Sequence, residues 1–541
     1  MPRRGVSWSR VAWRAVATTT LAAMAATGPG LAPTAAAKGK PDAAPATSQS
    51  PGNAKSPAHS QRPHATNAPG EPTTVLDVAH QIGADDLWAA GYTGGGVDVA
   101  VIDTGVAPIN ELSTTNIFVG PDLSLEGGVD GVAGLDTYGH GTHMVGIIAG
   151  RTPGADPLAP SPGDFVGIAP DAGIVSVKVA DNTGAVDVSQ VIAAIDWVVQ
   201  HRQHDGLDIR VLNLSYNNTS TQSPSEDPLS KAIENAWNHG IVVVVSSGNE
   251  GRSAKGLASP ATNPYVIAVS SVRLDDDADP TWTLPSWAPS GDGVRNPDVL
   301  APGQSLLSLR NPGSRVDVEH PDARHAADDR LFAGSGTSQS AAVVSGAAAL
   351  LIDQRPDLTP DQVKHLLTAS AITLEKNPKH QGHGVIDLGA AMQLAPPAAT
   401  QQFPPATGLG SLEAARGTDH ISIDGTLVTG EFTVTGAAWD PVAWVASSEA
   451  ATTWSGDDAW SGSSWSGSSW SGSSWSGSSW SGSSWSGSSW SGSSWSGSSW
   501  SGSSWSGSSW SGLSWSGSSW SGSSWSGSSW SGSSWSGSSW S

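Results

Sequence analysis

Short apolar runs alternate with helical patterns through the middle of the chain. Residues 97–103 are mostly apolar and are followed by Thr-Gly, a pattern typical of a buried parallel strand with Asp103 at its carboxyl end. Similar runs predict further strands over 174–179, 211–215, 241–245, 266–269 and 298–303. Strands of this kind are buried on both faces, which indicates that helices cover the sheet.

Helical patterns fill the intervals between these runs. Residues 189–200 have the spacing of an amphipathic helix. Another helix is predicted to begin after Asp227 as N-cap, with Pro at its first position, and to end before Gly240. A capping-box sequence at Thr359 predicts one more. The alternation predicts an α/β fold, with a mostly parallel central sheet and helices on both faces, within one domain over 73–394.

The most apolar helical pattern begins at Ser338. From Ser338 to Ile352 every residue except Gln339 is small or apolar, and a helix that is apolar on every face is buried. Ser338 would lie at its start, where free N–H groups and the helix dipole favour negative charge. Ser338 is therefore a candidate nucleophile, although serine is also a common helix cap. A serine nucleophile needs a base, an orienting carboxylate and an oxyanion donor.

Three other polar residues are predicted to meet at one edge of the sheet. Asp103 ends a strand, Asn249 follows the strand over 241–245, and His140 opens an apolar, glycine-bearing helix. The carboxyl ends of parallel strands face the ligand crevice, which places Asp103 and Asn249 together. His140 and His143 also have the spacing of half a zinc site, but no Glu follows at the spacing of zinc hydrolases, so no metal site is predicted.

Charge and composition exclude several classes of function. The chain has 26 Lys and Arg against 48 Asp and Glu, a net charge of −22, which disfavours nucleic acid as a partner. It has no cysteine, which excludes disulfides, thiol catalysis and thiolate metal sites.

The N-terminal residues have the layout of a signal peptide. Four arginines precede an uncharged stretch over 15–26, and Ala-Ala-Ala ends at Ala37. This predicts a signal peptide over 1–37, although a basic disordered leader would have a similar composition. Residues 38–72 have the composition of a disordered Ala/Pro-rich linker. The sequence contains no run of about 18 apolar residues, so no transmembrane anchor is predicted. We therefore expect a secreted, extracellular protein, with retention at the cell surface as an open question.

The C-terminal part of the chain is divided by composition. Residues 395–408 are predicted to be a Pro-rich linker, and residues 409–460 a small β-hairpin-like segment with a turn at Asp424-Gly425. Residues 461–541 repeat Ser-Gly-Ser-Ser-Trp sixteen times, with one Leu interrupting. This low-complexity array either stacks on cell-wall glycan or another surface, or is a spacer expanded by repeat slippage.

Four local sequences resemble the subtilisin family of serine proteases, the subtilases. They are Val-Ile-Asp-Thr-Gly around Asp103, His-Gly-Thr-His from His140, Ser-Ser-Gly-Asn ending at Asn249 and Ser-Gly-Thr-Ser ending at Ser338. The resemblance covers roughly residues 84–392, and its Asp, His, Ser order is that of the subtilisins.

This resemblance implies a subtilisin-like three-layer fold and a serine endopeptidase acting on proteins or peptides. Ser338 would attack the scissile carbonyl, His140 would take its proton, and Asp103 would orient the imidazole. Asn249 and the Ser338 N–H would form the oxyanion hole. The chemistry would need no cofactor. A structural calcium ion stays open, because the insertion over 151–164 prevents alignment of the family's calcium loop.

The resemblance also implies which residues bind substrate. Ser215 and Tyr216 would form a strand edge that pairs with an extended peptide, and Ser246, Ser247 and Gly248 would line the cleft. The sequence Tyr-Asn-Asn from Tyr216 replaces the usual Leu-Gly-Gly, which predicts a bulkier cleft edge.

Two other interpretations compete with this one. Gly-Thr-Ser-Gln-Ser around Ser338 is close to the Gly-x-Ser-x-Gly elbow of α/β-hydrolases, with Asp387 and His383 downstream. Its second glycine is missing, and these partners do not end apolar strands. The second interpretation belongs to another class of function: a non-catalytic protein that binds surfaces through its Trp-rich tail.

Overall fold

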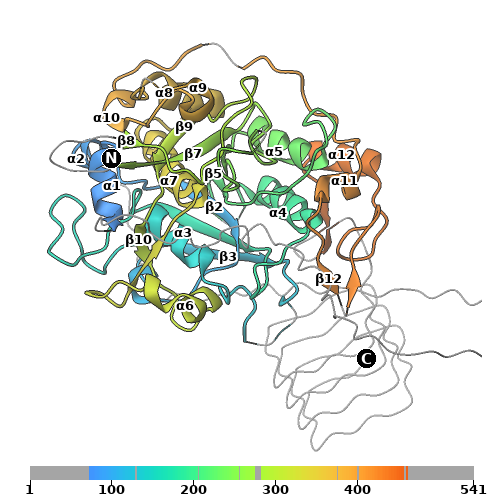
Figure 1. Ribbon diagram of the computed structural model, residues 1–541, viewed down its shortest axis with the longest axis horizontal. Helices are drawn as coiled ribbons and strands as arrows, with labels where there is room; N and C mark the ends of the chain where they lie inside the picture. The colour runs from blue at the N-terminus through green and yellow to red at the C-terminus, as the bar shows by residue number, and fades with distance from the viewer. Residues whose placement is uncertain are drawn as a thin grey trace, which may run out of the picture. The chain divides into compact units, whose positions relative to one another are not determined.

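An eight-stranded sheet lies at the centre of the computed structural model (Figure 1). The structure describes residues 72–460, apart from 128, 130, 205, 255, 275–281, 375, 399–400, 424 and 456–458. The predicted signal peptide, nearly all of the predicted 38–72 linker and the Trp repeat lie outside the described residues.

The sheet is parallel except at one edge. Its order is β3-β4-β2-β5-β6-β7-β8, with β9 also paired to β7, and β8 alone is antiparallel to its neighbour. The strands are β2 (Asp98–Asp103), β3 (Ile117–Asp122), β4 (Gly173–Lys178), β5 (Ile209–Leu214), β6 (Val242–Ser246), β7 (Ile267–Leu274), β8 (Trp282–Thr283) and β9 (Val299–Pro302). A second sheet contains β1 (Thr73–Thr74), β10 (Leu306–Leu309) and β11 (Leu331–Gly334).

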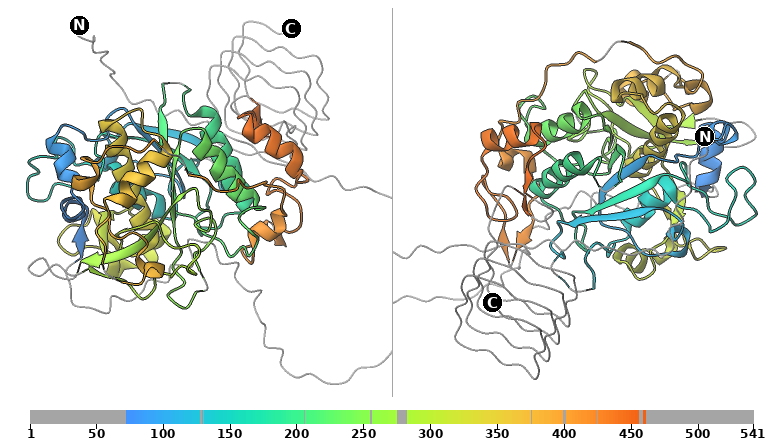
Figure 2. Two further views of the ribbon diagram at one scale, coloured as in Figure 1. Left: turned by 90° about the horizontal axis from the view of Figure 1, so that it is seen from above. Right: turned by 180° about the vertical axis from the view of Figure 1, so that it is seen from behind.

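Helices cover both faces of the central sheet, with α3 and α7 packed together on one face and α4 and α5 on the other (Figure 2). The helices are α1 (Val75–Gln81), α2 (Ala84–Ala89), η2 (Asn110–Leu112), α3 (His140–Ala149), α4 (Val188–His201), α5 (Pro228–Asn238), α6 (Arg315–Glu319), η3 (Pro321–Ala323), α7 (Thr337–Gln354), α8 (Pro360–Ala369), α9 (Pro378–Gln381), α10 (Leu388–Ala391), α11 (Leu412–Arg416) and α12 (Pro441–Glu449). The predicted α/β class is confirmed, and each strand and helix predicted within the sheet domain is present with its ends shifted by a few residues. Within the part of the chain that the structure describes, no helix is both long and apolar enough to cross a membrane.

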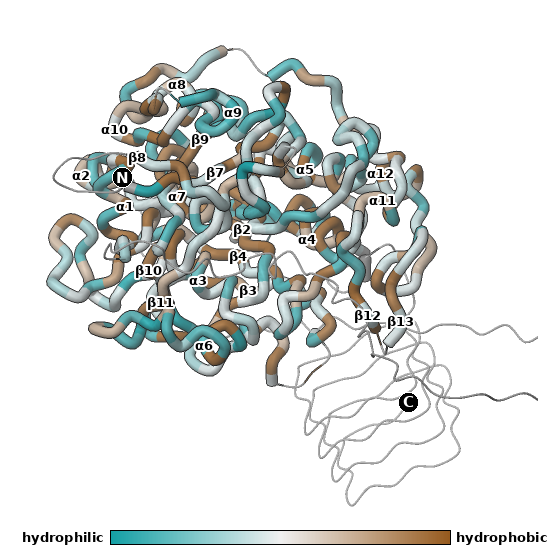
Figure 3. The backbone as a smooth tube through the Cα atoms, viewed as in Figure 1, coloured by the Kyte–Doolittle hydropathy of each residue, from teal (hydrophilic) through white to brown (hydrophobic). Residues whose placement is uncertain are grey.

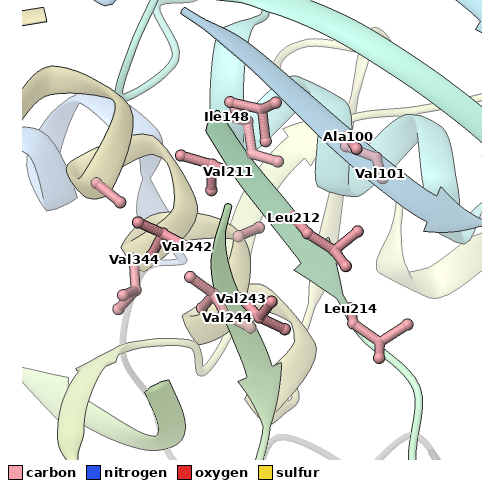
Figure 4. Close-up of a cluster of buried hydrophobic side chains, with 14 of the residues drawn as sticks. Ala100, Val101, Ile148, Val211, Leu212, Leu214, Val242, Val243, Val244 and Val344 are labelled. Carbon is pink, nitrogen blue, oxygen red and sulfur yellow. The ribbon is translucent and has the colours of Figure 1, made fainter. Parts of the chain in front are cut away.

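The core lies between the sheet and its helices. Apolar stretches run along the central strands (Figure 3). Val242 lies beside Val344 of α7, whereas Leu212 and Leu214 point to the other face of the sheet (Figure 4). The whole of α7 from Thr337 to Ile352 is buried, as its uniformly apolar sequence predicts.

Helix α4 departs from its predicted amphipathic character. Every residue from Val188 to Val199 is buried, including Asp196. The reason lies in the C-terminal segment, which crosses the outer faces of α4 and α5 (Figure 1). The sequence of α4 predicts an amphipathic helix because it contains polar positions. It does not reveal that the C-terminal segment covers the face that carries them.

The C-terminal segment contains a hairpin where one is predicted, because β12 (Ser422–Ile423) and β13 (Thr426–Leu427) pair on either side of positions 424–425. It also contains a second short hairpin, β14 (Trp454–Ser455) with β15 (Ala459–Trp460), and the helices α11 and α12, which were not predicted. Asp424 of the predicted turn lies outside the described residues. The predicted linker over 395–408 is not free of the domain either, since the Ala406 N–H donates to Glu234 at 2.7 Å. The start of α12 does have a local signal that the prediction did not use, since Asp440 is its N-cap and Pro441 its first residue.

A buried ion pair fastens this segment to the sheet domain. Arg416 Nε lies 2.6 Å from Asp187 Oδ2, and both side chains are 0% exposed. Asp187 is the N-cap of α4, where its side chain accepts from the Ser189 N–H at 2.9 Å. Arg416 also donates to the Gly430 carbonyl at 2.6 Å, so its charge is paired and its hydrogen bonds are used.

Breaking this pair should destabilise the protein strongly. We expect Arg416→Met to lower the free energy of unfolding by about 3–5 kcal/mol, because it leaves the Asp187 carboxylate buried without its counter-charge. Urea denaturation followed by tryptophan fluorescence measures the change. Arg315→Met is the control: its ion pair with Glu319 is 37% and 48% exposed, and its loss should cost less than about 1 kcal/mol. If both substitutions lowered the free energy of unfolding by the same amount, burial would not be the reason for the effect of Arg416→Met.

Candidate active site

Asp103 and His140 form a close, buried pair. His140 Nδ1 lies 2.8 Å from Asp103 Oδ1 and 2.9 Å from Asp103 Oδ2, and the two residues are 8% and 7% exposed. Asp103 ends β2 and His140 begins α3, as the sequence predicts. Burial lowers the pKa of His140, but the adjacent Asp103 carboxylate outweighs this effect, and the net shift is upward.

A glycine at position 141 allows the helix start to come this close to the end of the strand. A Cβ atom at Gly141 would lie 2.1 Å from the Gly105 carbonyl oxygen. Any larger residue at Gly141 would therefore push α3 away from β2 and separate His140 from Asp103.

Asp136 holds the same junction from a third side. Its carboxylate accepts hydrogen bonds from the Gly139 N–H at 2.6 Å and the Thr142 N–H at 2.8 Å, which are free donors at the start of α3. It also accepts from Thr104 Oγ1 at 2.7 Å, beside Asp103. Burial raises the pKa of Asp136, although these hydrogen bonds oppose the shift. The sequence indicates Asp136 only as a loop residue near His140, because its partners belong to separate elements.

Ser338 lies in the first turn of α7 and is 2% exposed. The helix begins one residue earlier than predicted, at Thr337. The Ser338 carbonyl accepts from Ser215 Oγ at 3.4 Å, and Ser215 Oγ accepts from Asn213 Nδ2 at 3.1 Å. Ser345 Oγ in turn donates to Asn213 Oδ1 at 2.9 Å, so a chain of hydrogen bonds connects the end of β5 with the first turn and the middle of α7.

Asn249 is oriented by the residue before the serine. Its Oδ1 accepts from the Thr337 N–H at 2.9 Å and from Thr337 Oγ1 at 3.3 Å. Thr337 Oγ1 also contacts the Gly248 carbonyl at 3.0 Å, which fixes the loop after β6 against the start of α7. With Oδ1 engaged in this way, Nδ2 is the donor that Asn249 can offer to a substrate oxygen. Thr337 was not among the predicted site residues, and its position next to Ser338 is the signal that could have found it.

The predicted substrate-binding residues differ in exposure. Ser215 is half-buried beside Ser338, whereas Ser246, Ser247 and Gly248 are buried. Tyr216, from which a bulkier cleft edge is predicted, is 5% exposed and belongs to the main hydrophobic core.

The two asparagines that follow Tyr216 also point into the protein. Asn217 Nδ2 donates to the Ser246 carbonyl at 2.7 Å, and Asn218 Nδ2 donates to the Ala415 carbonyl at 2.8 Å. Their side chains therefore hold neighbouring segments in place instead of crowding the cleft edge.

His143 lies next to the pair but in a different environment. It is 4% exposed, and burial together with the nearby His140 lowers its pKa to about 3, so it is neutral at physiological pH. Within the described part of the chain, no group of three or more His, Asp or Glu side chains is placed to hold a metal ion.

The fold and these contacts together indicate a class of protein. A parallel α/β sheet whose edge carries an Asp–His pair, a serine at the start of a buried helix and an oriented amide has the parts of a serine hydrolase. The chain belongs to the subtilase family, whose family model matches residues 94–384.

Individual relatives agree with this family. The serine protease AprX of Bacillus subtilis is 36% identical over 292 residues, which cover 51% of this chain and 61% of AprX. The chain thus spans less than two thirds of that relative. Subtilisin DY of Bacillus licheniformis is 30% identical over 58% of this chain and 96% of its own length. The minor extracellular protease Epr of Bacillus subtilis is 29% identical over 56% of this chain and 39% of Epr.

A solved structure is also similar. Fervidolysin from Fervidobacterium pennivorans, described as a keratinolytic enzyme related to subtilisin, matches with a TM-score of 0.47 and 26% sequence identity. The match covers 59% of this chain and 46% of fervidolysin.

Proposed function

We propose that this protein is a secreted serine endopeptidase that hydrolyses peptide bonds in proteins through an Asp103–His140–Ser338 triad. The observation that carries the proposal is the buried Asp103–His140 contact of 2.8 Å at the end of β2, on a chain of the subtilase family. The predicted signal peptide, and the extracellular relative Epr, support the secreted location.

Each residue has a defined part in the reaction. His140 Nε2 removes the proton from Ser338 Oγ as this oxygen attacks the scissile carbonyl, and Asp103 keeps the Nδ1 proton of His140 in place. The oxygen that becomes negative is stabilised by the Ser338 N–H and Asn249 Nδ2. The amine then leaves with the proton from His140, and water attacks the acyl-enzyme by the same proton route in reverse.

The substrate is proposed to bind as an extended strand. The backbone that follows β5, at Ser215 and Tyr216, would pair with it, while the loop at Ser246, Ser247 and Gly248 would form the facing wall. A catalytic metal or organic cofactor has no part in this scheme, and a structural calcium ion is left open. For the Trp repeat we propose contact with cell-wall glycan or a similar surface, because indole rings stack on sugar faces.

Casein hydrolysis by the purified full-length protein tests the function. We expect hydrolysis that stops when a serine-directed phosphonate modifies one residue, identified as Ser338 by mass spectrometry of the peptides. A folded protein that neither cleaves casein nor reacts with the phosphonate would overturn the proposal. It would favour the alternative, a non-catalytic surface-binding protein whose working part is the Trp repeat.

The pH dependence should follow His140. Only neutral imidazole can accept the serine proton, so kcat/KM should rise with pH through the pKa of His140. Since Asp103 raises that pKa, the midpoint should lie above the ordinary value of 6.5. Rates on an uncharged peptide substrate between about pH 5 and about pH 10 locate it. A midpoint below 6.5 would contradict the upward shift.

A further inference from the structure

The C-terminal segment also contacts the proposed substrate-binding edge. We call residues 401–454 the C-terminal clamp; they lie beyond the end of the family match at residue 384. The clamp crosses α5 and α4, and its last residue, Trp454, is the first residue of β14. Figure 2 shows its helices, in orange, beside α4 and α5.

Buried polar contacts hold the clamp in a single position. Trp444 Nε1 donates to Asp196 Oδ2 at 2.8 Å, and Ser448 Oγ donates to Asp196 Oδ1 at 2.6 Å. Trp454 Nε1 donates to the Ala193 carbonyl at 3.0 Å. A buried carboxylate in the middle of α4 thus accepts two hydrogen bonds from the clamp, and sliding of the clamp would break both of them.

The last turn of α11 and the loop that follows it, together residues 415–419, reach the chain just past Tyr216. The Asn218 amide donates to the Ala415 carbonyl at 2.8 Å, the Thr219 N–H donates to Asp419 Oδ2 at 3.0 Å, and the Thr418 N–H donates to Thr219 Oγ1 at 2.8 Å. Three hydrogen bonds therefore join two consecutive residues of the edge to residues 415–419.

Gly417 permits this approach. Its φ is +64°, a left-handed conformation, and a Cβ atom there would lie 2.5 Å from the backbone carbon of Thr219. The edge is held from its other side as well, because the Asn218 N–H donates to the Ser259 carbonyl at 2.9 Å. The residues after Ser215 are thus fixed between two segments.

We propose that the loop over 415–419 of the C-terminal clamp is a positioning element that holds the substrate-binding edge at residues 215–219 in the conformation that pairs with an extended peptide. The inference rests on the proposed protease function. Its residues touch neither the substrate nor the reacting atoms. Residues 415–419 increase the affinity of the enzyme for an extended peptide. Without them the edge would be flexible, and each binding event would have to order it.

Gly417→Ala tests the proposal in the full-length protein. The added methyl group would displace the loop from Thr219, so we expect KM for a peptide substrate of several residues to rise about three- to tenfold, the equivalent of losing one to two hydrogen bonds. The rate of modification by a small phosphonate should stay within about twofold of wild type, since the triad is untouched.

Gly425→Ala is the matched control. Gly425 is in the same clamp with φ +79°, but nothing lies within 4 Å of its Cβ position. Alanine there also has to adopt a positive φ, but without the contact, and the KM of Gly425→Ala should equal that of wild type. Asp419→Ala serves as a second variant if Gly417→Ala does not fold, because it removes the hydrogen bond to Thr219 without steric conflict.

The outcomes separate this inference from the proposed function. An unchanged KM in Gly417→Ala, or equal increases in Gly417→Ala and Gly425→Ala, would overturn the positioning role. Loss of phosphonate reactivity in a folded Gly417→Ala would also overturn it, since the clamp would then act on the triad. Wild-type protein that does not react with the phosphonate would instead refute the protease assignment.

Discussion

Replacement of Ser338 by alanine is expected to reduce kcat for peptide hydrolysis by a factor on the order of 10⁶, the size of the loss measured for the nucleophile in subtilisin. Without Oγ there is no attacking atom and no acyl-enzyme, while Asn249 and the substrate edge remain in place. Steady-state hydrolysis of a chromogenic peptide, with an assay sensitive enough for residual turnover, measures the change.

Ser340→Ala is the control for this substitution. Ser340 lies in the same turn of α7, but its hydroxyl donates to the Ala301 carbonyl at 2.9 Å. Its loss should leave most of the activity, with a small loss of stability. A Ser338→Ala protein that kept more than about one per cent of wild-type kcat would rule out Ser338 as the nucleophile.

Replacement of Asp103 by asparagine should lower kcat by about 10⁴-fold. Asparagine has nearly the same shape, but its amide N–H can face His140 Nδ1 and stabilise the tautomer that carries its proton on Nε2. That tautomer cannot accept a proton from Ser338. The pKa of His140 should also fall once the carboxylate that raises it is gone, so the pH profile of the residual activity should shift downward.

Asp85→Asn provides a matched comparison. Asp85 pairs with His80 at 3.0 Å, but on the surface, where the side chains are 42% and 55% exposed. The same chemical change there should leave kcat unaltered. If Asp103→Asn also had normal activity, the orienting role of Asp103 would be disproved.

The sheet and its main helices could be predicted because their signals are local. An apolar run such as 97–103 must be buried on both faces, and a cap such as Asp227 before Pro228 marks a helix start wherever the chain later goes. The candidate site follows from the same reasoning, since parallel strands bring their carboxyl ends to one edge.

The remaining features depend on contacts between distant parts of the chain. Tyr216 follows a strand and was expected at the surface of the cleft, but it joins the core beneath the clamp. Asp187 and Arg416 form a buried pair that is unremarkable in sequence, because each residue alone has the pattern of a surface charge. Asp136 likewise gains its partners only when β2 and α3 meet.

The order of the clamp in the chain has a consequence for biosynthesis. A ribosome completes Asp103, His140 and Ser338 before it reaches Ala415 and Asp419, which brace the substrate edge. On the proposed roles, a nascent chain that ends just after Ser338 has its nucleophile but lacks the support for an extended polypeptide. Under the same proposal, trimming of the clamp from the finished protein would weaken the binding of polypeptides and leave Ser338 in place.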